Sequence, residues 1–198
     1  MSSYLAALIG YVIGGIPTGI WISKLVAGKD PRAVGSGSSG ATNVSRVLGK
    51  KWGIVVLLLD ALKGFAPVFW LAPLIFTEDL VGAQVIMACC AVMGHVFTPF
   101  ANFKGGKGVA TGAGAMAAVD PLALLFSLGA WIVVFVVSRR VSPASILAAI
   151  AFPVLMWRIH DGVPTIKVLG GVVIALFLIY THRQNIIRLF LGTEPRFF

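Results

Sequence analysis

Seven apolar runs dominate the sequence and leave few options for its fold. They cover residues 4–26, 53–76, 80–100, 109–119, 122–138, 145–157 and 166–181. With 58% hydrophobic and only 12% charged residues, the chain carries more apolar surface than a soluble domain of 198 residues can bury. A membrane-spanning helix needs about 20 apolar residues, so several runs are short. The sequence predicts an all-α integral membrane protein with seven transmembrane helices.

The basic residues test this count, because cytoplasmic loops of membrane proteins are enriched in Lys and Arg. Dropping the weakest span, 109–119, would reverse the side of everything after it. With seven spans, thirteen of the sixteen basic residues share one face. These are Lys24, Lys29, Arg32, Arg46, Lys50, Lys51, Lys104, Lys107, Arg139, Arg140, Arg183, Arg188 and Arg196.

The opposite face then carries mostly acidic residues. Its two basic residues, Arg158 and Lys167, are outnumbered by Glu78, Asp79, Asp120 and Asp161. We therefore predict a single seven-helix membrane domain over residues 1–198. Its N-terminus lies outside, its C-terminus is cytoplasmic, and short interfacial helices lie on the cytoplasmic side.

A polar, glycine-rich segment at 35–51 interrupts the apolar pattern on the basic face. Glycines such as Gly37 and Gly40 allow the backbone to turn N–H groups toward an anion, and Ser36 adds a hydroxyl donor. Arg46 can hold two phosphate oxygens with its planar guanidinium. The pattern indicates a phosphate-binding loop, and the alternative is a flexible cytoplasmic loop. The glycines also match G-x-G-x-x-G, but they follow a membrane segment instead of a strand, so a dinucleotide site is not predicted.

The residues that follow these glycines, Ala41–Leu48, are expected to form a short interfacial helix. Asn43 and Arg46 would share one face of this helix, while Val44 would face apolar surroundings. We predict Thr42 and Asn43 as additional contacts to substrate phosphate.

A second polar segment on the same face holds two lysines among three glycines. These five residues are Lys104, Gly105, Gly106, Lys107 and Gly108. They precede a predicted short helix, whose N-terminus would add free N–H groups and a positive dipole, so we predict phosphate contacts here. The order does not match the Walker A pattern, and ATP hydrolysis is not predicted. Upstream, His95 could bond a substrate or a helix backbone, and we favour the backbone.

The third polar segment follows the last apolar run. His182 and Asn185 are spaced i, i+3, so they project from one side of the final helix toward a common substrate site. Arg183 and Arg196 are expected to contact lipid headgroups.

Two charged residues, Asp60 and Lys63, lie inside the second apolar run and share a helix face. Each would cost about 2.5–3.5 kcal/mol in mid-membrane on insertion scales, so their presence requires an explanation. We favour a buried ion pair, and the alternative is a functional site near the helix end.

Metal, cofactor and nucleic-acid functions are not predicted. Cys89 and Cys90 are adjacent in an apolar run, so they cannot easily bridge each other or ligate a metal. The net charge of +9 follows membrane topology, and no basic patch interleaved with aromatic residues argues for nucleic acid. The sequence indicates no oligomeric state.

Together, the three polar segments resemble the acyl-phosphate-dependent glycerol-3-phosphate acyltransferase family of bacterial inner membranes. The resemblance covers nearly the whole chain, and Ser38 departs from the Asn that is common in the family. The residues that carry it are Gly35, Ser36, Gly37, Gly40, Ala41, Thr42, Asn43, Arg46, Gly94, His95, those at 103–111, His182, Arg183, Asn185, Ile186, Arg188, Leu189, Gly192 and Glu194.

The resemblance implies transfer of a fatty acyl group from acyl phosphate to the 1-hydroxyl of glycerol 3-phosphate, giving lysophosphatidate and phosphate. The shared basic face of the three polar segments predicts that this active site faces the cytoplasm, with membrane lipids as the surroundings. The resemblance also implies a glycerol-phosphate site shaped by the glycines at 105–108. The residues implied to position the substrates are Ser36, Arg46, Lys104, His182 and Asn185.

No Ser-His-Asp arrangement or H-x-x-x-x-D acyltransferase pattern is present in the sequence. We therefore expect direct attack by the glycerol hydroxyl, with a substrate phosphate assisting proton removal and cations stabilising the departing phosphate. The alternative base is His182. A transporter of phosphorylated solutes and a structural scaffold are competing functions. The lack of a recognisable inverted repeat and the one-sided polar segments argue against a transporter.

Overall fold

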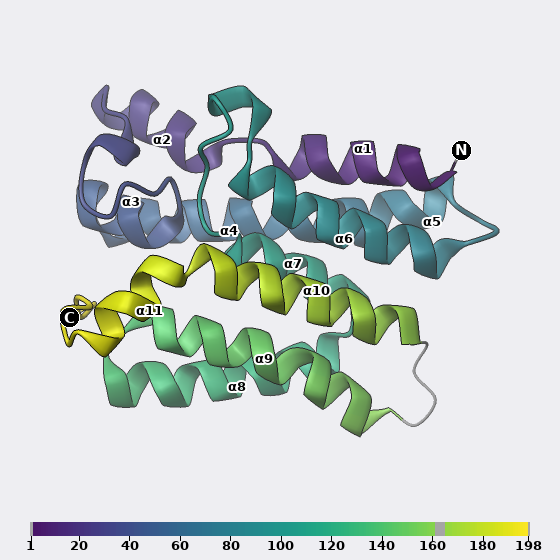
Figure 1. Ribbon diagram of the computed structural model, residues 1–198. Helices are drawn as coiled ribbons and strands as arrows, with labels where there is room; N and C mark the ends of the chain where they lie inside the picture. Colours follow the sequence, from purple (N-terminus) through teal and green to yellow (C-terminus); the bar gives the residue numbers. More distant parts are fainter. Residues whose placement is uncertain (1, 161–164, 198) are drawn as a thin grey trace. The chain divides into compact units, whose positions relative to one another are not determined.

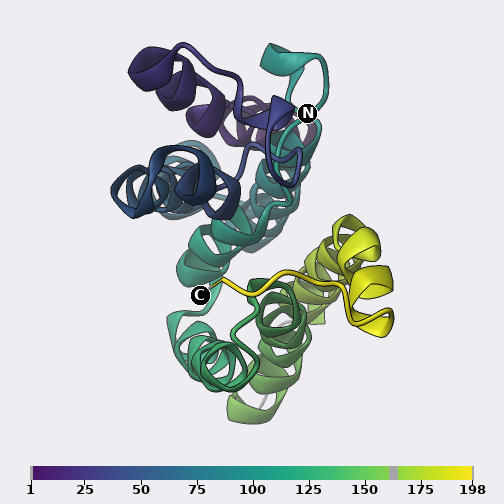
Figure 2. The same cartoon turned by 90° about the vertical axis from the view of Figure 1, so that its left-hand side faces the viewer.

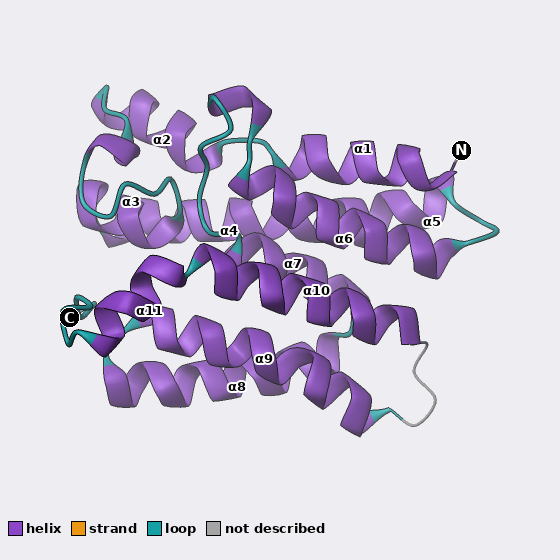
Figure 3. Cartoon of the chain, in the orientation of Figure 1, coloured by secondary structure: helices purple, strands orange, loops and turns teal. Residues whose placement is uncertain are grey.

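The computed structural model describes residues 2–160 and 165–197, and all secondary structure in these ranges is helical (Figures 1 and 3). The all-helical prediction is confirmed for these residues. Asp161, predicted to lie on the face opposite the basic one, is outside these ranges. The chain divides into two compact units, Met1–Val119 and Asp120–Phe198. The single seven-helix domain stays a prediction.

Each unit is built from consecutive helices. The first contains α1 (Ser2–Gly14), α2 (Thr18–Ala27), η1 (Pro31–Ala33), α3 (Ala41–Leu48), α4 (Lys50–Ala66), the π-helical turn η2 (Pro67–Leu71), α5 (Ala72–Ile75), α6 (Leu80–Val96), η3 (Pro99–Ala101) and α7 (Val109–Val119). The second contains α8 (Pro121–Ser138), α9 (Val141–Ile159), α10 (Thr165–Thr181) and α11 (Arg183–Phe190).

Among the described residues, five helical segments are long and apolar enough to cross a membrane. They are Ser3–Ala27, Lys50–Ile75, Leu80–Ala101, Pro121–Ser138 and Val141–Ile159. A sixth results if α10 and α11, bent by 59° at their junction, form one span. The remaining apolar helix, α7, is shorter. Every predicted apolar run therefore contains a helix, while the count of seven spans stays a prediction.

Small residues let the helices of the first unit approach closely. A Cβ added to Gly14 of α1 would lie 2.1 Å from the carbonyl oxygen of Ala91 in α6. A Cβ on Gly114 of α7 would lie 1.9 Å from the carbonyl oxygen of Ala61 in α4. Side chains at these positions would push the helix pairs apart, so these glycines allow the close packing of α1 on α6 and of α7 on α4. Figure 1 shows α1 lying along α6.

A break between α1 and α2 frees backbone groups that other helices use. Pro17 stands at the N-cap of α2 and lacks an N–H, so the helical hydrogen-bond ladder stops there. The carbonyl of Ile16 accepts a hydrogen bond from Nζ of Lys63 at 2.7 Å. The carbonyl of Gly15 accepts one from the Thr98 hydroxyl. Because neighbouring side chains satisfy these groups, the break is tolerated within an apolar segment.

Candidate active site

A buried polar cluster joins α2, α4, α6 and α7. Oδ1 of Asp60 lies 2.8 Å from Nζ of Lys63 and accepts a hydrogen bond from the Thr18 hydroxyl. Nδ1 of His95 lies 3.0 Å from Oγ1 of Thr111 and 3.6 Å from Oδ1 of Asp60. The predicted ion pair is confirmed. The expectation that His95 bonds a helix backbone is corrected, because its Nδ1 faces two side chains.

The segment 102–108 folds back over His95. The N–H of Gly106 donates to the carbonyl of His95 at 3.3 Å. A Cβ on Gly106 would lie 2.2 Å from Nε2 of His95 and 3.3 Å from the backbone nitrogen of Gly40. A Cβ on Gly105 would lie 1.9 Å from the His95 carbonyl oxygen. Glycines at these positions therefore bring the second polar segment against the first, at the start of α3.

Asn43 organises the first polar segment from inside. Its side chain is only 1% exposed. Nδ2 donates to the carbonyl oxygens of Pro31, Val34 and Ser38 at 2.7, 3.0 and 2.8 Å. Oδ1 accepts a hydrogen bond from the N–H of Ser36 at 2.9 Å. The amide is thus used within the loop, and a contact between Asn43 and substrate phosphate stays a prediction.

Helix α3 has the predicted bounds, Ala41–Leu48. Val44 is fully buried, as expected, but Asn43 turns into the loop while Arg46 is exposed. Arg46 and Asn43 therefore do not present one common polar face. Ser36 is exposed as well, and among the described residues no side chain or carbonyl pairs with the Arg46 guanidinium. Arg46 is available to bind an anion.

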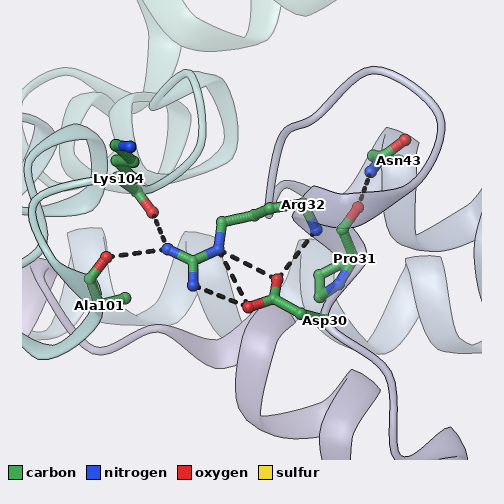
Figure 4. Close-up of polar contacts among 6 residues, drawn as sticks. All are labelled: Asp30, Pro31, Arg32, Asn43, Ala101 and Lys104. Carbon is green, nitrogen blue, oxygen red and sulfur yellow. Dashed lines mark hydrogen bonds and ion pairs between the residues drawn. The ribbon is translucent and has the colours of Figure 1, made fainter.

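Asp30 and Arg32, which had no predicted role in the site, connect the loop before the first polar segment to Lys104 in the second (Figure 4). Nη2 of Arg32 lies 2.7 Å from Oδ2 of Asp30. Nη1 of Arg32 donates to the carbonyl oxygens of Ala101 and Lys104, each at 2.8 Å. The hydrogen bond from the Arg32 side chain holds the pKa of Asp30 below its ordinary value, although burial opposes this shift.

The second loop leads directly into α7. Lys104 is exposed, Lys107 is half-buried, and Gly108 is buried with φ +85. Helix α7 begins at Val109, as predicted, so the glycine-rich loop stands at a helix N-terminus. Phosphate contacts from this loop stay a prediction. Figure 2 shows the cartoon from the side on which α2 and α3 are labelled in Figure 1.

In the second unit, His182 occupies the junction between α10 and α11 and is 3% exposed. Its Nδ1 donates to the carbonyl of Leu178 at 2.7 Å, which makes Nε2 the proton-accepting nitrogen of the neutral ring. Asn185 is also buried. The five candidates for positioning substrates therefore fall in both units, and their meeting at one site stays a prediction.

Glu194, which carried part of the resemblance but had no assigned role, is a buried carboxylate in this unit. Oε1 accepts hydrogen bonds from the Ser142 hydroxyl at 2.6 Å and from Nδ2 of Asn185 at 2.7 Å. Oε2 accepts one from Nε of Arg188 at 2.7 Å. Burial alone would raise the pKa of Glu194, but these hydrogen bonds outweigh it and lower the pKa below its ordinary value. Glu194 thereby fixes Asn185 against the start of α9.

We expect Glu194→Gln to lower the free energy of unfolding by about 1.5–3 kcal/mol, because a neutral amide weakens three charge-assisted hydrogen bonds. The carboxylate's contribution is fully present above its unfolded pKa, near 4.5, and is lost as pH falls through the lower folded pKa. Thermal unfolding in detergent between pH 7 and pH 3 measures both effects. The exposed Glu78→Gln variant is the control. Parallel pH curves for wild type and Glu194→Gln would contradict this assignment.

Comparison with known proteins identifies close relatives. The chain matches the family model described as Glycerol-3-phosphate acyltransferase over residues 4–192. It is 42% identical to a glycerol-3-phosphate acyltransferase of Chlorobaculum tepidum, over 99% of this chain and 97% of the relative. It is 41% identical to one of Fusobacterium nucleatum, over 100% of this chain and 99% of the relative.

Two solved structures have the same fold. The first is the glycerol 3-phosphate form of PlsY (YgiH), described as an integral membrane glycerol 3-phosphate acyltransferase. Its TM-score is 0.90 at 42% identity, covering 99% of this chain and 96% of that chain. The second, the lysophosphatidic acid form, has a TM-score of 0.87 at 40% identity, covering 99% of this chain and 95% of that chain.

Proposed function

Because the chain belongs to the glycerol-3-phosphate acyltransferase family, we propose that it takes its acyl group from acyl phosphate and transfers it to the sn-1 hydroxyl of glycerol 3-phosphate. The chain is an integral membrane acyltransferase of phospholipid synthesis. The proposed products are lysophosphatidic acid and inorganic phosphate. The reaction is the first step of that synthesis.

The observation that carries this proposal is the meeting of the two glycine-rich loops at Gly40 and Gly106. Helix α3 begins after Gly40 without a side-chain cap, so its first N–H groups remain for an anion. Arg46 and Lys104 are exposed cations on these same segments. N–H groups and cations are what two phosphate-bearing substrates require.

The chemistry follows from the activated donor. The glycerol hydroxyl attacks the carbonyl carbon of the acyl phosphate, the new ester bond forms, and the bond from the carbonyl carbon to the phosphate oxygen breaks. A substrate phosphate takes the hydroxyl proton, and the cations stabilise the departing phosphate. The mixed anhydride supplies the activation, so the step needs neither coenzyme A nor a metal. The alternative base is His182, acting through Nε2.

We further propose that this site faces the cytoplasm of a bacterial inner membrane. The polar segments share their predicted face with most of the chain's Lys and Arg residues, which favours the cytoplasmic side. Both phosphorylated substrates can then reach the loops from the cytoplasm, while the acyl chain stays among the apolar helices.

The donor assay tests the proposal. Purified protein in detergent, with a metal chelator present, is offered labelled glycerol 3-phosphate and either palmitoyl phosphate or palmitoyl coenzyme A. We expect 1-acyl lysophosphatidic acid from palmitoyl phosphate and none from palmitoyl coenzyme A. Failure with both donors in folded protein would contradict the proposal, and uptake of phosphorylated solutes into liposomes would then test the transporter alternative.

A further inference from the structure

The turn that carries Lys104 has an unusual backbone. Asn102 and Phe103 both have φ +56, in the left-handed region that residues other than glycine seldom adopt. Two such residues in succession persist only where the surrounding structure holds them. The carbonyl groups on either side of this pair, those of Ala101 and Lys104, converge on one nitrogen (Figure 4).

That nitrogen is Nη1 of Arg32, which lies 2.8 Å from each carbonyl oxygen. The rest of the guanidinium is held by Asp30. Nε lies 3.0 Å from Oδ1, and Nη2 lies 2.7 Å from Oδ2. Oδ1 of Asp30 also accepts the backbone N–H of Arg32 at 3.0 Å. All three guanidinium nitrogens are therefore engaged, and the planar group has one defined orientation.

The loop that carries Arg32 is itself anchored. Its neighbour Pro31 is buried, and the carbonyl of Pro31 accepts a hydrogen bond from Asn43 at 2.7 Å (Figure 4). Asn43 belongs to α3, so its hydrogen bond to Pro31, the peptide bond from Pro31 to Arg32 and the hydrogen bond from Arg32 connect α3 to the backbone of Lys104. The left-handed turn is thereby fixed relative to α3.

We propose that Arg32, oriented by Asp30, is a positioning residue that sets the location of Lys104 for acyl transfer. This inference rests on the proposed function, in which Lys104 contacts substrate phosphate. Arg32 does not touch the substrate in this scheme. It acts through the peptide groups that flank the left-handed turn, so its effect depends on the Lys104 side chain.

The first test is Arg32→Lys. A lysine keeps the charge, but one ammonium cannot hold both carboxylate oxygens and both carbonyls in this planar arrangement. We expect kcat to fall about 10- to 100-fold, the scale that a small misplacement of a catalytic group produces. The KM for glycerol 3-phosphate should change less than 3-fold, and the thermal midpoint should stay close to that of wild type. The control is Lys29→Ala, which removes an exposed charge nearby and should leave kcat unchanged.

The second test asks whether Arg32 acts through Lys104. In a Lys104→Ala background, Arg32→Lys should lower the remaining kcat by less than about 2-fold, because contacting residues in one network are not additive. An equal loss in both backgrounds would overturn the proposal.

Asp30→Asn keeps the carbonyl contacts and serves as a second variant if Arg32→Lys does not fold. Asp30→Asn should lower kcat less than Arg32→Lys does, and this loss should also shrink in the Lys104→Ala background. An unchanged kcat in Asp30→Asn would count against the proposal.

The acyl-transfer activity and the positioning role of Arg32 can be overturned separately. A folded wild-type protein that makes no product from palmitoyl phosphate would overturn the proposed function. An active wild type whose Arg32→Lys variant has normal kcat would overturn the positioning role alone.

Discussion

We expect Arg46→Lys to lower kcat/KM for acyl transfer by about 100-fold or more, the scale that follows when a donor to developing charge is lost. Arg46 is exposed in the last turn of α3, and no hydrogen bond joins its guanidinium to another described residue. Its replacement therefore removes no hydrogen bond or ion pair to another described residue. A lysine retains the charge but cannot hold two phosphate oxygens at once. Steady-state kinetics with palmitoyl phosphate and glycerol 3-phosphate measure the loss.

The control for this variant is Arg196→Lys, since Arg196 is another exposed arginine on the predicted cytoplasmic side. We expect normal kinetics for the control and the same thermal midpoint for both variants. Near-normal kinetics in Arg46→Lys would mean that Arg46 serves membrane topology alone.

The buried pair of Asp60 and Lys63 gives the second large effect. Asp60→Leu leaves the Lys63 ammonium buried without its counter-ion and should lower the free energy of unfolding by about 3–5 kcal/mol. Thermal unfolding in detergent measures this change. Oδ1 of Asp60 also lies 3.6 Å from Nδ1 of His95, which packs against Gly106, so activity should fall as well.

The double variant Asp60→Leu/Lys63→Met separates two explanations. Removing both charges should restore most of the stability, since an apolar pair can replace a buried ion pair at little cost. The ion-pair interpretation would be wrong if Asp60→Leu were as stable as wild type. Loss of activity at unchanged stability would support the alternative of a functional site near the helix end.

Features set by neighbours in sequence were predictable. The bounds of α3 follow from the glycine before Ala41 and the apolar spacing after it, and the start of α7 follows from the glycines that end at Gly108. The pairing of Asp60 with Lys63 follows from their spacing on one helix. In each case the physical cause lies within about one helical turn.

Contacts that close over long distances in sequence were not predictable. Arg32 bonds carbonyls 69 and 72 positions further along the chain, and backbone carbonyls carry no signal of residue type. Asp30 directly before Pro31 does indicate a local turn. The contact between Asp30 and the backbone of Arg32 was therefore predictable from the sequence, whereas the contacts of Arg32 with the two carbonyls were not. The hydrogen bonds from Asn43 to the loop carbonyls were not predicted. The helical pattern shows on which side of α3 Asn43 lies, but it does not show that the preceding loop folds over that side.

Phosphate release by the wild-type protein tests direct acyl transfer most directly. The enzyme is mixed with palmitoyl phosphate alone, inorganic phosphate is followed on the timescale of one turnover, and glycerol 3-phosphate is then added. Direct attack predicts no phosphate before the second substrate arrives, and then equal amounts of phosphate and lysophosphatidic acid. A burst of phosphate equal to the enzyme concentration, with the palmitoyl group attached to a protein side chain, would contradict it.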